Sequence, residues 1–214
     1  AAIMDGKDGS YGACALINKV KNPIQLANKI MISDDKAKFV GGNKETYKLA
    51  KKYNLKTVPW RYFRSEYRNQ LNNINSKHNY GTVGAVAMDQ LGNIVAGTST
   101  GGLYNKEKGR IGDTPIINIS TYANNKIGGI SLTGKGEYIL KHAIAHDIIS
   151  KMKYKKISME KAIKELLPEL KKNNVGIIGI DAKNGECNLN FNTKRMFRAS
   201  VNSKKRNIIN VGNM

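Results

Sequence analysis

The order in which strand and helix patterns follow one another restricts this chain more than any other feature. Apolar or alternating runs typical of strands occupy residues 10–18, 38–41, 82–88, 94–100, 126–133, 175–181, 187–191 and 196–201. Helical periodicity occupies residues 22–31, 43–54, 137–153 and 158–170. These elements come in blocks and do not alternate regularly. The order therefore predicts an α+β fold, with a mixed, largely antiparallel sheet arrangement and helices outside it.

One stretch separates the blocks. The pattern dissolves between Thr57 and Tyr80, where the second half is rich in Asn and Ser, as is typical of a linker. At 214 residues the chain is long enough for a complete core. We therefore expect a single domain over residues 1–214, with a linker at about 66–81.

Composition excludes two classes of protein. The sequence has no apolar run near the ~20 residues that a membrane-spanning helix needs, so we expect no membrane segment. The two cysteines, Cys14 and Cys187, are too few for a disulfide scaffold and fit a reducing compartment. We therefore expect a cytoplasmic protein.

The net charge of +20 raises the hypothesis of a nucleic acid or another polyanion as partner. The excess is spread along the chain: residues 1–81 carry 15 basic and 6 acidic side chains, and residues 82–214 carry 21 and 10. An even spread favours a solvated basic surface over a dedicated binding site.

A pair of histidines suggests zinc. His142 and His146 are four residues apart, a spacing that places two ligands on one helix face. Ala143 stands where a metalloprotease would carry its glutamate, and a third ligand is not evident. The sequence therefore favours a structural pair, and we expect no metal site.

Three threonines lie beside glycines at strand ends: Thr82 after Gly81, Thr100 before Gly101, and Thr133 before Gly134. Hydroxyls in such positions can supply a nucleophile and oxyanion donors. Between them, Arg110 and Asp113 present a cation and a carboxylate three residues apart. This pair could hold a zwitterionic amino acid, and an ordinary ion pair in a loop is equally compatible with it.

A longer series of motifs points to a family. In order along the chain, the motifs are Gly81-Thr-Val-Gly-Ala-Val-Ala87, Thr98-Ser-Thr-Gly-Gly102, Gly109-Arg-Ile-Gly-Asp-Thr-Pro115, Thr133-Gly-Lys-Gly-Glu137 and Phe191-Asn-Thr193. Together they resemble the plant-type asparaginase / isoaspartyl peptidase family of N-terminal-nucleophile hydrolases. The resemblance implies a four-layer αββα sandwich. It also implies autocleavage between Gly81 and Thr82 into an α-subunit (1–81) and a β-subunit (82–214), assembled as an (αβ)₂ heterotetramer.

The resemblance also assigns roles. Thr82 would be the nucleophile and its freed α-amine the base, with Thr100 activating it and with Thr133 and Gly134 forming the oxyanion hole. Arg110 would hold the α-carboxylate of the substrate and Asp113 its α-ammonium. The remaining substrate-binding residues would be Ile111, Gly112, Thr133, Gly134, Lys135 and Gly136. The implied substrates are small molecules, L-asparagine and β-aspartyl dipeptides, hydrolysed through an acyl-enzyme.

The chain also departs from the family pattern. The family's first strand, which ends in His-Gly-Gly-Ala-Gly, its covering helices and an Asn-Ala-Gly segment that supports a sodium loop do not appear before Ala1. We therefore expect a partial α-subunit in a truncated chain, and no cofactor. Lys135 is bulkier and more charged than expected at its position. The alternatives are an inactive pseudoenzyme, a glycosylasparaginase-like amidase and a basic polyanion-binding protein; the two cysteines and Thr98-Ser-Thr-Gly-Gly102 favour the asparaginase branch.

Overall fold

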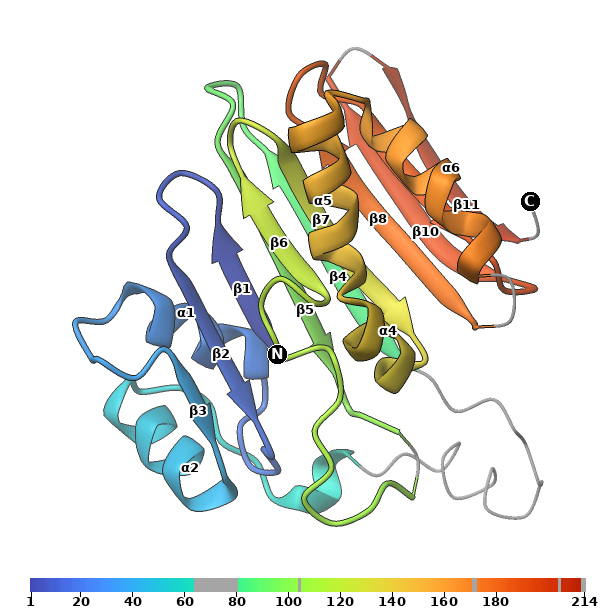
Figure 1. Ribbon diagram of the computed structural model, residues 1–214. Coiled ribbons are helices and arrows are strands. Elements are labelled where there is room, and N and C mark those ends of the chain that lie inside the picture. The colour runs from blue at the N-terminus through green and yellow to red at the C-terminus, as the bar shows by residue number, and fades with distance from the viewer. Residues whose placement is uncertain (64–80, 104, 171–172, 204, 213–214) are drawn as a thin grey trace.

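The computed structural model describes residues 1–63, 81–103, 105–170, 173–203 and the backbone of 205–212. Most of the linker expected at 66–81 therefore lies outside the described residues. The strands are β1 (Ala2–Asp5), β2 (Tyr11–Ala15), β3 (Phe39–Gly41), β4 (Thr82–Met88), β5 (Ile94–Thr100), β6 (Thr121–Asn124), β7 (Gly128–Gly134), β8 (Val175–Asp181), β9 (Cys187–Phe191), β10 (Met196–Asn202) and β11 (Lys205–Gly212) (Figure 1). The helices are α1 (Pro23–Ile32), α2 (Asn43–Lys52), α4 (Gly136–His142), α5 (Ile144–Lys155) and α6 (Met159–Leu170), with a 3₁₀ turn at Trp60–Phe63.

Most strands belong to two sheets. One has the order β3-β2-β1-β5-β4 and the other β6-β7-β8-β9, while β10 and β11 form a separate ribbon. Pairing is antiparallel throughout these sheets except between β2 and β3. The prediction of a mixed, largely antiparallel arrangement is confirmed.

The two sheets face each other through small residues and hydroxyls. A Cβ on Gly84 of β4 would overlap the hydroxyl of Ser131 on β7, and a Cβ on Gly129 would lie 2.6 Å from Ile94. Thr98 of β5 shares hydrogen bonds with Thr121 of β6 (2.6 Å) and with Ser131 (2.7 Å). All three hydroxyl residues are buried, so these bonds offset the cost of removing the groups from water.

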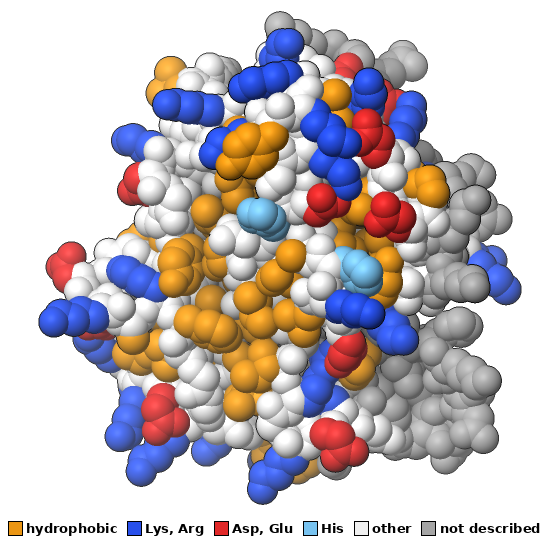
Figure 2. Space-filling model, viewed as in Figure 1, with side chains coloured by type: hydrophobic (Ala, Val, Ile, Leu, Met, Phe, Trp, Pro, Cys, Tyr) orange, Lys and Arg blue, Asp and Glu red, His pale blue; other side chains and the backbone are white. Residues whose placement is uncertain are grey.

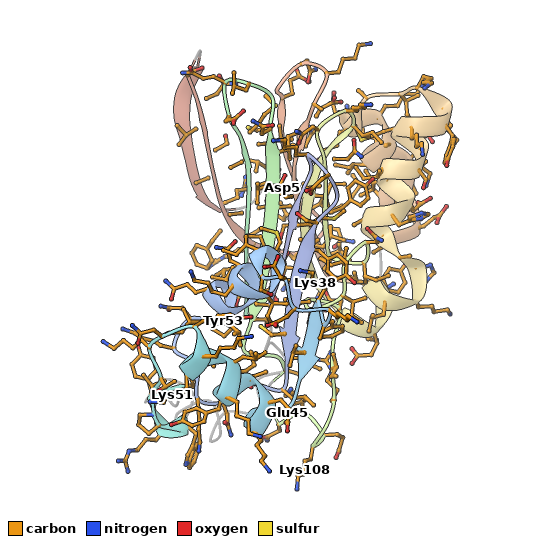
Figure 3. All side chains as sticks on the ribbon, turned by 90° about the vertical axis from the view of Figure 1, so that its left-hand side faces the viewer. Asp5, Lys38, Glu45, Lys51, Tyr53 and Lys108 are labelled. Carbon is orange, nitrogen blue, oxygen red and sulfur yellow. The ribbon has the colours of Figure 1, made fainter. Side chains whose placement is uncertain are left out.

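Helices cover the sheets on opposite sides. Helices α5 and α6 pack on β7 and β8, where Ile148, Ile163, Leu132 and Ile177 belong to one buried apolar cluster (Figure 1). Helix α1 packs against the other sheet so closely that a Cβ on Gly12 would overlap the carbonyl oxygen of Ala27. Figure 3 shows the strands between α1 on one side and α4 to α6 on the other.

The structure corrects several element predictions. The helix expected over 137–153 is two helices, because Ala143 adopts a left-handed conformation (φ 46°) and separates α4 from α5. The interpretation that His142 and His146 share one helix face is therefore wrong. Strands β1, β6 and β11 were not predicted, since each is short or lacks a clear alternation. Within the described ranges, no helix is long and apolar enough to cross a membrane.

Candidate active site

Thr82 and Thr100 lie opposite each other on neighbouring strands. Thr82 is the first residue of β4 and Thr100 the last of β5, and the antiparallel register pairs them directly. The Thr82 hydroxyl donates to the Thr100 hydroxyl at 3.3 Å. The position of each threonine thus follows from the register of a single strand pair.

The Thr100 hydroxyl has a complete set of partners. It accepts from the Thr82 hydroxyl and from the backbone N–H of Gly102 (3.0 Å), and it donates to the carbonyl oxygen of Gly81 (2.9 Å). One donor and two acceptor sites are all that a hydroxyl offers, so its proton is directed at the Gly81 carbonyl. That carbonyl belongs to the Gly81–Thr82 peptide bond, which is therefore polarised beside the Thr82 hydroxyl.

Gly134, at the end of β7 in the second sheet, lies near the two threonines. It ends β7 with φ 148°, a left-handed value that favours glycine, and a Cβ there would overlap the carbonyl oxygen of Asn174. Gly134 borders the same pocket as Thr82 and Thr100. Thr133, the preceding residue, is half-buried on β7 and is not among the residues that line the pocket.

Arg110 lies in the loop between β5 and β6 and is held from one side. Its Nε donates to Glu137 Oε1 at 2.8 Å, and its Nη2 lies 2.7 Å from the same oxygen. The Arg110 side chain is only 17% exposed, whereas that of Glu137 is 53% exposed. Partial burial alone would raise the pKa of Glu137, but the hydrogen bond and charge of Arg110 outweigh it and lower that pKa.

Asp113 presents a buried carboxylate near Arg110. It accepts a hydrogen bond from the hydroxyl of Ser120, which is itself fully buried. Burial raises the pKa of Asp113, and the opposing effects of the Ser120 hydrogen bond and of Arg110 do not cancel that rise. The carboxylate therefore favours a cationic partner that would restore its charged form.

One pocket unites most of the residues proposed from the sequence. Its lining includes Gly81, Thr82, Thr100, Arg110, Gly112, Asp113, Gly134 and Gly136. Ile111 and Lys135 are exposed and, like Thr133, are not part of this lining. The pocket thus places two threonine hydroxyls beside a cation and a carboxylate, groups that can hold the two charges of an amino acid.

Metal-ligand clusters are a separate question. Among the described residues no group of three or more His, Cys, Asp or Glu side chains could hold a metal ion. The His142 ring packs against Tyr138, with ring centroids 4.2 Å apart, and His146 lies beside Ser150 on α5. Figure 2 shows both pale blue histidine side chains at the surface.

Comparison with known proteins decides the family. The asparaginase family model matches residues 1–76 and 68–211, which is nearly the whole chain. The chain belongs to the asparaginase family.

Relatives of the chain are named isoaspartyl peptidase, plant-type L-asparaginase or isoaspartyl peptidase/L-asparaginase. The isoaspartyl peptidase of Escherichia coli is 35% identical, over 93% of this chain and 67% of its own. The plant-type L-asparaginase of Pyrobaculum calidifontis is also 35% identical, over 92% of this chain and 70% of its own. The isoaspartyl peptidase/L-asparaginase of Xenopus laevis is 36% identical, over 94% and 68%. The resemblance stated from the motifs is confirmed.

Several residues of this asparaginase pocket were not singled out from the sequence. Gly102, Leu103 and Thr114 also line it. Outside the lining, Glu137 binds Arg110 and Ser120 binds Asp113. The glutamate lay at the end of a quoted motif, but its pairing with a residue 27 positions away has no local signal. Ser120 likewise lies in an irregular loop whose path only the fold defines.

Proposed function

We propose that this protein hydrolyses the side-chain amide of L-asparagine and the isopeptide bond of β-aspartyl dipeptides. The proposal includes the four-layer αββα sandwich of N-terminal-nucleophile hydrolases, with Thr82 as the nucleophile. The observation that carries it is the Thr100 hydroxyl, which bridges the Thr82 hydroxyl and the Gly81 carbonyl in a pocket that Arg110 and Asp113 also line.

The first step prepares the enzyme. Thr82 Oγ adds to the Gly81 carbonyl carbon, the bond from that carbon to the Thr82 nitrogen breaks, and the hydroxyl proton passes to that nitrogen. The donated hydrogen bond from Thr100 supports the negative charge that develops on the Gly81 oxygen. Water then hydrolyses the ester, which leaves a carboxylate on Gly81 and a free α-amine on Thr82.

Turnover uses the same hydroxyl. The α-amine, with an ordinary pKa of about 7.7 to 8.0, takes the proton of its own Thr82 hydroxyl as that oxygen attacks the substrate carbonyl. Thr133 and Gly134 are proposed to support the oxyanion, and Thr100 to orient the nucleophile. The amide nitrogen leaves with a proton, as ammonia or as the amine of an amino acid, and water releases aspartate from the Thr82 ester.

Arg110 and Asp113 are proposed to select the substrate. A guanidinium binds a carboxylate by paired hydrogen bonds, and a buried carboxylate favours an ammonium partner. In the proposal, Gly112 and Gly136 complete this side of the pocket, and their chain neighbours Ile111 and Lys135 contribute from outside the lining. A zwitterionic aspartyl group would thus be fixed at both charges with its β-carbonyl directed at Thr82.

The proposal also covers assembly. Cleavage would yield a partial α-subunit of residues 1–81 and a β-subunit of residues 82–214, and two such pairs would form an (αβ)₂ heterotetramer. Nucleophile, base and oxyanion donors are all groups of the chain, so the mechanism as proposed requires no cofactor.

Mass spectrometry and product assays test the proposal together. We expect the purified protein to separate under denaturing conditions into fragments 1–81 and 82–214. We expect it to release aspartate from L-asparagine and from β-aspartyl dipeptides. Thr82→Ala should remain one chain and lose activity by roughly a thousandfold or more, because both nucleophile and cleavage are lost.

Thr193→Ala is the matched control. Thr193 lies between β9 and β10, outside the pocket lining, and its hydroxyl donates to the carbonyl of Arg195. This variant should cleave and turn over as the wild type does. A folded wild-type protein that stays uncleaved and releases no aspartate would contradict the proposal, and would favour an inactive member of the family.

A further inference from the structure

We propose that Glu137 is a positioning residue that orients the Arg110 guanidinium and thereby sets the selectivity of the pocket for a free α-carboxylate. This inference rests on the proposed function, because it concerns the same pocket. It assigns a role to a residue outside the pocket lining.

Arg110 directs only some of its N–H donors at Glu137. A guanidinium carries five N–H donors in a planar fork. Glu137 Oε1 takes the edge formed by Nε (2.8 Å) and Nη2 (2.7 Å). The remaining donors belong to Nη1 and to the second N–H of Nη2, which form the edge suited to a ligand carboxylate.

Packing shows that this orientation leaves little freedom. A Cβ on Gly112 would lie 2.8 Å from Arg110 Nη1, and a Cβ on Gly136 would lie 2.9 Å from Nη2. The guanidinium therefore packs close to both glycines, which line the pocket and leave no room for a side chain there. Glu137 follows Gly136 directly in the first turn of α4, so the helix fixes its carboxylate relative to this packing.

The same packing involves Asp113. A Cβ on Gly136 would lie 2.5 Å from Asp113 Oδ1, so Arg110 and Asp113 approach the same glycine. If Arg110 were not held by Glu137, its nearest carboxylate in the pocket would be Asp113, and the two would neutralise each other. The Glu137 pair therefore keeps cation and carboxylate available as separate sites for the two charges of an aspartyl ligand.

The experiment compares two ligands that differ in one group. L-Aspartate has a free α-carboxylate, whereas L-isoasparagine has an α-amide in its place and is otherwise of the same shape. We would measure the Kd of both by calorimetry for the wild type, Glu137→Ala, Glu137→Gln and Glu137→Asp. KM and kcat for L-asparagine would be measured on the same preparations.

Glu137→Ala should weaken the binding of L-aspartate by about tenfold, because the charge-assisted pair that orients the Arg110 guanidinium is lost. The Kd of L-isoasparagine should change less than about twofold, so the ratio between the ligands collapses. KM should rise in parallel while kcat stays within about threefold. Glu137→Asp should recover part of the wild-type ratio. The ratio for Glu137→Gln should lie between those of Glu137→Ala and Glu137→Asp.

Glu160→Ala is the matched control. Glu160 is 56% exposed and pairs with Lys164 at 2.6 Å on α6, so its removal also breaks one half-exposed ion pair. It should leave the ligand ratio unchanged. A role for Glu137 in stability alone predicts the same result for Glu137→Ala, with a lowered Tm and an intact ratio.

For the Glu137 variants, the inference would be overturned by an unchanged ratio, by an equal loss for both ligands, or by tighter L-aspartate binding, which would make Glu137 a competitor of the ligand. Failure of the proposed function looks different. In that case the wild type would bind L-aspartate without hydrolysing L-asparagine, and the Kd ratios would still test the role of Glu137. A wild type that binds neither ligand would overturn the inference as well.

Discussion

Asp113 holds its carboxylate where ionisation is unfavourable, and this has a consequence for stability. Burial raises its pKa in the folded protein above the ordinary value of about 3.9. The folded state therefore holds the proton more tightly than the unfolded state. The stabilisation from this group is full below the unfolded pKa and is lost as pH rises through the folded pKa.

Asp113→Asn should therefore be more stable than the wild type at pH 7, because an amide cannot ionise and can still bond to Ser120. The advantage should shrink as pH falls and vanish near pH 4, at about the unfolded pKa. Thermal unfolding of both proteins at a series of pH values measures this difference. Parallel curves would contradict it.

In the proposed function, the same residue would link pH to substrate binding. A protonated Asp113 cannot pair with an α-ammonium, so the KM for L-asparagine should rise as pH falls through the raised pKa. The variant should show a high KM at every pH. Stability and affinity thus oppose each other at this residue, as is common where a buried charge serves a ligand.

Between elements, the contact of β4 with β7 depends on the absence of a side chain. Gly84 faces Ser131 across the two sheets, and a Cβ would overlap the serine hydroxyl. Ser131 in turn shares its hydrogen bond with Thr98 of β5. Gly84 is paired with Thr98 in the β4–β5 ladder, two residues along from the pair of Thr82 and Thr100.

Gly84→Ala should lower the free energy of unfolding by about 1 to 3 kcal/mol, because the sheets must separate to admit a methyl group. Adding Ser131→Gly should recover part of this loss by removing the atoms that collide. Urea unfolding of the two single variants and the double variant gives the coupling energy. Additive losses would show that the two residues do not press on each other.

The elements differ in how much of them the sequence could predict. The segments 82–88 and 94–100 are runs of apolar and small residues around a short turn, and their register brings two candidate threonines together as expected. The break at Ala143 carries no such signal, since alanine favours a continuous helix and only packing imposes φ 46°. Strand β1 is four residues long and becomes recognisable only through its partners, β2 and β5.

The site shows the same division. Thr82, Thr100, Arg110 and Asp113 could be proposed because each lies in a motif of adjacent residues. Glu137 and Ser120 could not be given roles, because their partners are distant in the chain and the contacts depend on how the 101–120 loop returns to the sheets. The sequence therefore predicts most of the residues that line the pocket, whereas the residues that hold them in place can be identified only from the fold.

For the whole molecule, the proposed cleavage divides a sheet between two chains. Strand β1 belongs to residues 1–81 and pairs with β5 of residues 82–214, with Met4 opposite Ala96. Met4 is buried in a cluster with Ile94, Ala96 and Ala123. The break at Gly81 leaves this ladder and its apolar contacts intact.

The two fragments should therefore remain together after cleavage. Size-exclusion chromatography in native buffer should give one peak that contains both, and concentrated guanidinium chloride should resolve them. Separation without denaturant would mean that the β1–β5 ladder cannot hold the fragments together. Both fragments carry excess positive charge, and basic residues are scattered over the surface in Figure 2, so their mutual repulsion opposes association and weakens as salt rises. We expect the β1–β5 ladder and its apolar contacts to outweigh this repulsion.

The register of β4 against β5 makes the proposed cleavage a check on folding. A slip of one residue would turn Thr82 to the opposite face of its strand and remove its hydroxyl from Thr100. A misaligned chain would then stay whole, while a correctly aligned one would cut itself. The proportion of cut chain on a denaturing gel would thus count the molecules that had reached the native register, a built-in folding assay that needs no label and no substrate.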